Sequence, residues 1–191
     1  MSKNMNNFEI LRLNSPGITD FASERNLLMG KSKSDWVLFL DADEIIDGDR
    51  FKQFLEVATL DECNAFSFRC YWYFRSAKYQ ALKTENAGTA IRREVLRPEY
   101  ILSPRERWGM CAAPLYAHDV RGLDGLPMCH HYSWVRTKQE LLNKVRTWGH
   151  CKDRDWTKLV EDEFNHEFNG RDFVHGYRYN ILDTPFVEVG L

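Results

Sequence analysis

The sequence lacks several features that would assign it to a specialised class of protein. No apolar run approaches the roughly 20 residues of a membrane-spanning helix, and Met1–Asn7 shows none of the apolar core of a signal peptide. The net charge of −2 argues against a broad positive surface for nucleic acid or acidic membranes. We therefore expect a cytoplasmic protein with no integral membrane segment and no nucleic-acid partner.

The number and spacing of the cysteines also give no sign of disulfide pairing. The five cysteines are odd in number and include no C-x-x-C pair, which favours reduced, buried thiols over a disulfide framework or a zinc knuckle. Apolar residues make up 43% of the 191 positions, enough for one domain with a genuine hydrophobic core.

Hydrophobic patterning predicts an α/β arrangement in the first part of the chain. Residues 8–13 alternate as in a strand, a helix capped by Thr19 or Asp20 runs to about Ser32, and residues 36–40 form a continuous apolar strand. A strand, a helix and a strand in close succession form a βαβ unit, so the two strands should be parallel and buried.

Further helices and strands are predicted after this unit. We predict a helix from Gly48 through Val57, a long aromatic strand over 65–75, strands over 90–96 and 127–132, and a helix capped by Thr137. The interpretation places one domain over 1–150 and a polar, aromatic tail over 151–191, with one short helix over 156–164, packed on that domain.

The most informative motif is Asp41-Ala42-Asp43, followed directly by Glu44. In an extended segment Asp41 and Asp43 would point to the same side, at the end of a strand where α/β sheets bind ligands. Carboxylates suit Mn²⁺ or Mg²⁺, and such an ion would relieve the repulsion between crowded acids. The alternative is a solvated acidic turn that caps the next helix.

Downstream residues could complete such a site. His130 and His131 end a predicted strand, and because neighbouring strand residues face opposite ways, only one of them can enter a shared site. An imidazole is an acceptable ligand of Mn²⁺, and Arg136 could hold a phosphate oxygen. Arg25 could also reach a phosphate, although a surface position is the simpler interpretation for it.

These residues resemble glycosyltransferase family 2 of the GT-A fold. The resemblance rests on Phe21-Ala22-Ser23-Glu24-Arg25-Asn26, on the apolar strand that ends in Asp41-Ala42-Asp43, and on His131-Tyr132-Ser133-Trp134-Val135-Arg136 with Lys138 and Lys144 after it. It implies a GT-A-like mixed sheet flanked by helices and a metal-dependent transfer of sugar from a nucleotide-diphosphate donor to a glycan, lipid or protein acceptor. By the same resemblance, Asp41 would contact the donor, and Asp43, Asp41 and His131 would hold the metal.

The chain departs from the family pattern in two respects. The family's usual first nucleotide-binding strand and helix have no counterpart before Phe8, so we expect an N-terminally shortened domain or a second chain that supplies this half. The catalytic base is also ambiguous: Asp119 in Ala117-His118-Asp119-Val120 is the first candidate, followed by Glu106 and Asp124. Inversion and retention of the anomeric centre therefore both stay open.

Two other interpretations compete with a glycosyltransferase. A non-catalytic binding or assembly module derived from a transferase would retain the sheet and dispense with the metal residues. A metal-dependent phosphoryl-transfer enzyme would need a nucleophilic Asp with a supporting Lys and Thr or Ser, a set that the sequence does not offer.

Overall fold

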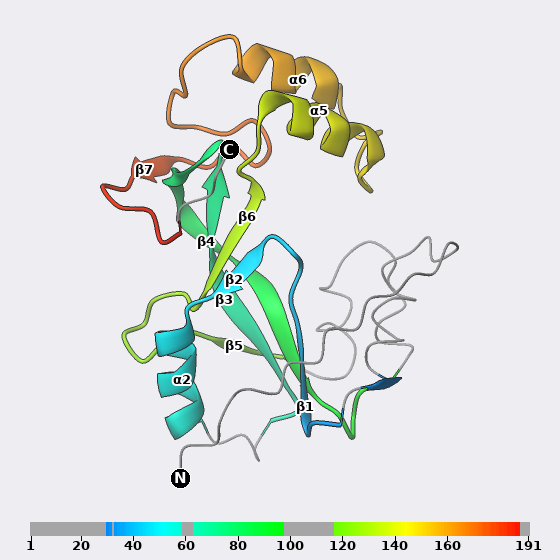
Figure 1. Ribbon diagram of the computed structural model, residues 1–191, viewed down its shortest axis with the longest axis vertical. Helices are drawn as coiled ribbons and strands as arrows, with labels where there is room; N and C mark the ends of the chain where they lie inside the picture. Colours follow the sequence, from blue (N-terminus) through cyan, green and yellow to red (C-terminus); the bar gives the residue numbers. More distant parts are fainter. Residues whose placement is uncertain (1–29, 32, 59–62, 98–116, 188–191) are drawn as a thin grey trace.

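The computed structural model describes residues 30–31, 33–58, 63–97 and 117–187. Within these ranges seven strands form one mixed sheet, and three helices are bounded, as Figure 1 shows. The order of the strands is β1-β4-β3-β6-β2, with β5 beside β3 and β7 beside β4. The strands are β1 Trp36–Phe39, β2 Glu44–Ile46, β3 Ala65–Phe74, β4 Ser76–Arg92, β5 His118–Val120, β6 Cys129–Trp134 and β7 Tyr179–Ile181.

The sheet is built around the hairpin of β3 and β4. Strand β3 is rich in aromatic residues, which favour a pleated and largely buried surface, and it confirms the strand predicted over 65–75. Strand β4 begins at Ser76, so the strand predicted over 90–96 was placed too late and too short. The first part of β4 is polar, and polar and apolar residues do not alternate along it. The pairing with β3, and not a local sequence pattern, therefore accounts for this part of the strand.

Strand β1 lies antiparallel to β4, with Phe39 opposite Thr89. The parallel partner predicted over 8–13, and the helix after it up to Met29, fall outside the described residues. Of the predicted βαβ unit, the structure therefore describes only the second strand and residues 30–31 of the helix.

Each of the three helices begins at a side-chain cap. Helix α2 (Gly48–Val57) follows Asp47, which accepts a hydrogen bond from Arg50 N at 3.1 Å. Helix α5 (Lys138–Thr147) begins with a capping box between Thr137 and Glu140. These two helices confirm the sequence predictions, as does α6 (Trp156–Glu163) in the tail.

Helices α5 and α6 lie together over one end of the sheet, while α2 lies at the other end (Figure 1). At the end of the sheet that carries α5 and α6, one hydrophobic cluster packs these helices against the strands. Its buried residues are Trp72, Phe74, Ala81, Trp134, Leu141, Val145, Trp156, Val160 and Val174. A second cluster joins α2 to the sheet through residues that include Phe54, Phe66, Phe68 and Met128. Residues 151–187 therefore contribute α6 and β7 to the same core and sheet, although the sequence predicted no strand there.

The segment between β1 and β2 crosses close to β4. A Cβ atom placed on Gly88 would lie 2.7 Å from Leu40 Cδ2 and 3.6 Å from the carbonyl oxygen of Phe39. Glycine at position 88 therefore allows the chain to approach the strand closely before it reaches Asp41. No helix in the described ranges is both long enough and apolar enough to cross a membrane.

Candidate active site

Asp41, Ala42 and Asp43 form a tight turn between β1 and β2. The Glu44 N–H donates to the Asp41 carbonyl at 3.0 Å, and Glu44 Oε2 accepts a hydrogen bond from Asp41 N at 3.1 Å. The prediction of an extended segment was therefore wrong, because the chain must change direction to pass from β1 to β2. The buried carboxylate of Glu44 stabilises this turn, and the Asp41 side chain is exposed.

Sheet register brings Asp43 to His131. Strand β2 pairs antiparallel with β6 so that Glu44 lies opposite His131, and Tyr132 N donates to the Asp43 carbonyl at 2.8 Å. As a result, Asp43 Oδ1 lies 3.4 Å from His131 Nε2. The two residues are far apart in sequence, so this contact depends on the pairing of β2 with β6.

Two cations complete the arrangement, which we call the Asp43 cluster (Asp43, His131, Arg136 and Lys144). Arg136 Nη2 lies 3.3 Å from Asp43 Oδ2, while its Nε donates to the Ser133 carbonyl at 3.0 Å. Lys144 Nζ donates to the same carbonyl at 3.0 Å and also to Ser133 Oγ. The end of β6 thus orients both side chains toward one carboxylate.

The electrostatics of the cluster favour an ionised Asp43. Burial alone would raise the pKa of Asp43, but contact with His131 and the positive charges of Lys144 and Arg136 hold this pKa well below its ordinary value. Burial lowers the pKa of Lys144 to about 8, against the opposing effect of Asp43. The cluster therefore pairs an ionised carboxylate with a lysine whose pKa is about 8.

His130 faces the opposite side of β6, which confirms that only one of the two histidines can enter the site. Its Nδ1 lies 2.7 Å from Tyr73 Oη, and its ring stacks on Phe186 with centroids 3.7 Å apart. Burial lowers the pKa of His130 to about 4, so the ring is neutral at physiological pH. His130 is therefore a packing residue of the other face.

The donor set of the cluster suits a hard divalent cation in part. In the portion of the chain that the structure describes, no three His, Cys, Asp or Glu side chains are grouped so that they could hold a metal ion. One carboxylate and one imidazole do converge at Asp43 and His131. Two protein ligands fit an Mn²⁺ or Mg²⁺ ion that takes its other ligands from water and substrate phosphates.

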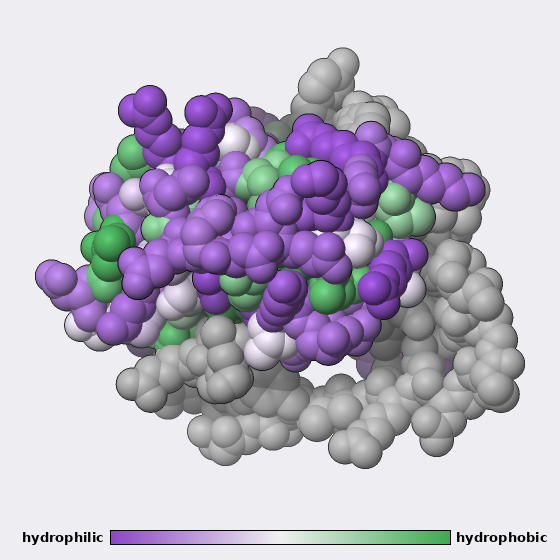
Figure 2. Space-filling model, turned by 90° about the horizontal axis from the view of Figure 1, so that it is seen from above, coloured by the Kyte–Doolittle hydropathy of each residue, from purple (hydrophilic) through white to green (hydrophobic). Residues whose placement is uncertain are grey.

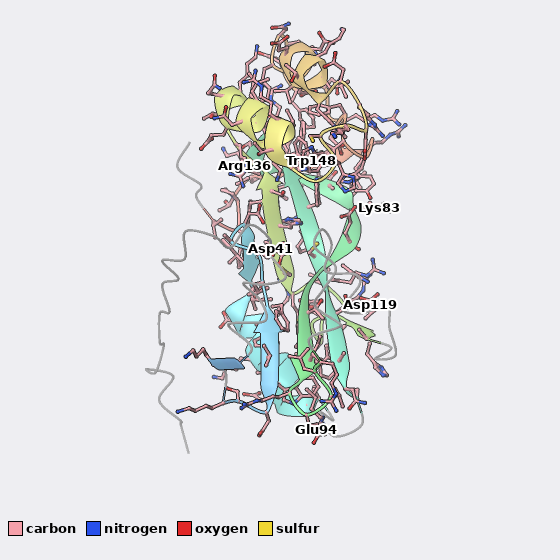
Figure 3. All side chains as sticks on the ribbon, turned by 90° about the vertical axis from the view of Figure 1, so that its right-hand side faces the viewer. Asp41, Lys83, Glu94, Asp119, Arg136 and Trp148 are labelled. Carbon is pink, nitrogen blue, oxygen red and sulfur yellow. The ribbon has the colours of Figure 1, made fainter. Side chains whose placement is uncertain are left out.

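The structure places the first candidate base, Asp119, apart from the cluster. Asp119 lies on β5 and pairs with Arg69, with Asp119 Oδ2 at 2.8 Å from Arg69 Nε. On β3, Asp119 is opposite Ser67 and His131 is opposite Trp72. Five strand positions correspond to about 16 Å. Figure 3 likewise shows Asp119 well away from Asp41 and Arg136. Asp119 is thus not brought to Asp43.

Of the other predicted residues, one makes a surface contact and two fall outside the described residues. Asp124 pairs with Arg50 of α2 at 2.8 Å and accepts a hydrogen bond from Leu126 N, so it fastens the loop before β6. Glu106 and Arg25 fall outside the described residues, and their roles stay predictions.

Two residues at or beside the site received no role from the sequence, although Lys144 belongs to the motif that carries the family resemblance. Lys144 lies three positions after the buried Leu141 and beside the buried Val145, so a lysine on the inner stripe of a predicted helix was a usable signal. Trp72 packs edge-on against the His131 ring, with centroids 4.7 Å apart. Nothing in the sequence distinguishes Trp72 from the other aromatic residues of β3.

Comparison with known proteins gives one match. The family model described as glycosyl transferase family 2 matches residues 6–117, which is more than half of the chain. Comparisons with curated proteins and with solved structures gave no match. The matched segment includes Asp41 and Asp43, whereas His131, Arg136 and Lys144 follow it.

Proposed function

This chain belongs to glycosyltransferase family 2, and from that premise we propose that it transfers a sugar from a nucleotide-diphosphate donor, whose diphosphate is held by the Asp43 cluster. The open, mostly antiparallel mixed sheet agrees with the predicted GT-A-like fold. The observation that carries the proposal is the convergence of His131, Arg136 and Lys144 on Asp43, at the motif where the family resemblance places the donor.

The charges of the cluster suit a diphosphate. Arg136 presents a planar guanidinium, which can donate two parallel hydrogen bonds to phosphate oxygens, and Lys144 adds a compact positive charge beside it. Both side chains are already oriented by Ser133, so little ordering is needed when the anion binds. These two residues would orient the donor and stabilise the charge that develops on its leaving group.

Asp43 and His131 would hold the divalent cation. When bound, Mn²⁺ or Mg²⁺ acts as a Lewis acid toward the leaving diphosphate. The low pKa of Asp43 keeps its carboxylate available as a ligand over the physiological pH range. Asp41, exposed on the same turn, is proposed to contact the ribose or the sugar of the donor.

The test is calorimetric titration of the chain with UDP and with GDP. Each titration is done in the presence of Mn²⁺ and repeated with EDTA in its place. We expect at least one nucleotide to bind only with the metal, and Asp43→Ala to weaken this binding about 100-fold or more. Asp119→Ala is the matched control and should bind like the parent. Thermal melts of Asp43→Asn, which retains the shape of the side chain, separate loss of binding from loss of fold.

A folded chain that binds neither nucleotide with Mn²⁺ would contradict the proposal and would favour a non-catalytic binding module. Equal losses in Asp43→Ala and Asp119→Ala would also contradict it, because the structure brings only Asp43 to the cluster.

A further inference from the structure

A hollow of about 610 Å³ opens at the loop 171–177, and its walls carry more positive than negative side chains. Lys83 comes from β4, Arg154 from the segment before α6, and Arg171 from the loop before β7. The loop 172–177 forms the remaining wall and includes His175 and Tyr177. Figure 2, which looks onto the end that carries α5 and α6, shows a largely hydrophilic surface there.

The loop that lines the hollow is held by a buried carboxylate. Asp172 is 3% exposed and accepts hydrogen bonds from the N–H groups of His175, Gly176 and Tyr177 at 2.6, 3.1 and 3.0 Å. Tyr179 Oη donates to it at 2.8 Å. Gly176 has a φ of +72°, a conformation that glycine adopts without strain. The wall is therefore formed before any ligand arrives.

The cations of the hollow are not neutralised by ion pairs. Arg154 donates to the Phe173 carbonyl at 3.1 Å, Arg171 donates to the Gly176 carbonyl at 3.0 Å, and Lys83 Nζ lies 4.9 Å from the centre of the Tyr177 ring. Within the described ranges none of the three has a carboxylate at ion-pair distance.

Asp172 in the wall and Glu85 beside Tyr177 already accept hydrogen bonds. Asp172 directs its oxygens to the loop, and Glu85 accepts a hydrogen bond from Tyr177 Oη. An anion that entered the hollow would therefore meet three exposed cations, with both neighbouring carboxylates engaged elsewhere.

A single indole connects the hollow with the Asp43 cluster. The Trp72 ring packs edge-on against His131 at 4.7 Å between centroids and against His175 at 4.8 Å. Trp72 is 6% exposed, so this one buried ring contacts a residue of the cluster and a wall residue of the hollow.

We infer that the hollow binds the phosphate group of a phosphorylated sugar acceptor, an inference that rests on the proposed transferase function. Arginine and lysine side chains recognise phosphate oxygens through charge-assisted hydrogen bonds, and three cations suit a doubly charged phosphomonoester. His175 and Tyr177, whose rings stack with centroids 4.9 Å apart, add polar ring atoms to the same wall, where the sugar would lie.

The test is titration of the full chain with glucose 6-phosphate, glucose and inorganic phosphate, followed by NMR spectroscopy or calorimetry at low salt. We expect glucose 6-phosphate to bind more tightly than the other two probes, and Lys83→Gln or Arg154→Gln to weaken it about 5-fold each. Arg121→Gln is the matched control, because Arg121 is also exposed and donates to a glycine carbonyl, that of Gly125 at 3.2 Å.

Three outcomes would overturn the inference: no binding of glucose 6-phosphate, equal binding of inorganic phosphate, or equal losses in Arg121→Gln. A loss of UDP affinity in Lys83→Gln would also overturn it, because the hollow would then hold the donor. A chain that binds UDP with Mn²⁺ but no glucose 6-phosphate contradicts this inference alone. A chain that binds glucose 6-phosphate but neither nucleotide contradicts only the proposed function, since Asp43→Ala should leave the hollow unchanged.

Discussion

Two carboxylate–arginine pairs lie in different parts of the same sheet, and the looser pair belongs to the candidate active site. Asp43 and Arg136 approach to 3.3 Å, whereas Asp119 and Arg69 approach to 2.8 Å. A short distance between opposite charges is thus no measure of function. The difference lies in what surrounds each pair and in which strands carry it.

The surroundings of the two pairs differ in charge and exposure. The Asp43 side chain is 24% exposed and has His131, Arg136 and Lys144 as neighbours, with Asp41 on the same turn. The Asp119 side chain is 40% exposed, and its arginine also donates to the Thr84 carbonyl. The first pair belongs to a cluster with a second cation and a histidine, while the second is a surface contact between strands.

The histidines of the two regions should give the largest contrast between them. His131→Ala should weaken the apparent affinity for Mn²⁺ in the presence of UDP by about 30- to 100-fold, because it removes one of two proposed protein ligands. His118, exposed and next to Asp119, is the matched control, and His118→Ala should leave the Mn²⁺ titration unchanged. If both variants lose affinity to the same extent, metal binding does not distinguish the two regions.

The arginines should give a somewhat smaller contrast. Arg136→Met removes a proposed phosphate contact and should raise the Kd for the nucleotide about 10- to 30-fold, a loss of about 2 kcal/mol. Arg69→Met should change the Kd less than 2-fold, because Arg69 donates to Asp119 and a backbone carbonyl far from the cluster. Calorimetry with Mn²⁺ measures both. A larger loss of nucleotide affinity in Arg69→Met than in Arg136→Met would place the nucleotide at β5.

A dependence on pH should separate the regions further. Burial lowers the pKa of Lys144 to about 8, so in the free protein this lysine loses its charge as the pH rises through that value. We expect the nucleotide affinity with Mg²⁺ to fall about 5- to 10-fold between pH 7 and 9. Lys144→Arg stays charged over this range and should remove most of the dependence.

The stability of the fold should respond to the same titration in the opposite direction. In the unfolded chain Lys144 has its ordinary pKa of 10.5, so between about pH 8 and 10.5 the unfolded state binds more protons. The contribution of Lys144 to the free energy of unfolding therefore rises with pH in this window. Urea denaturation of the parent and of Lys144→Arg measures it, and an equal slope in both would contradict the assignment.

Elements with strong local signals were predictable from the sequence. Thr137 and Glu140 form the capping box of α5, and Leu141 and Val145 supply its buried stripe, all within one short segment. Strand β3 likewise follows from its own aromatic run. The polar first part of β4 carried no such signal, because its partner strand supplies the reason to be extended.

The candidate site was predictable as a set of residues but not as a geometry. Asp43, His131 and Arg136 were named from the motifs, and the structure brings them together through the pairing of β2 with β6. Asp119 was named by the same kind of reasoning, yet the register of β3 holds it elsewhere. Register is a long-range property, and a one-residue slip would turn every side chain to the other face.

The smallest expected effect concerns the direct energy of each pair. A double-mutant cycle on Arg69→Met and Asp119→Ala should give a coupling below about 0.5 kcal/mol in the free energy of unfolding, because exposed pairs are screened by water and salt. The cycle on Arg136→Met and Asp43→Ala should give about 1 kcal/mol, since the Asp43 side chain is more shielded. Both couplings come from urea denaturation at low salt, with a repeat at 0.5 M NaCl. Should the Asp119 coupling equal or exceed that of Asp43, then shielding and neighbouring cations do not set the strength of these pairs, and the contrast drawn between the two regions loses its electrostatic basis.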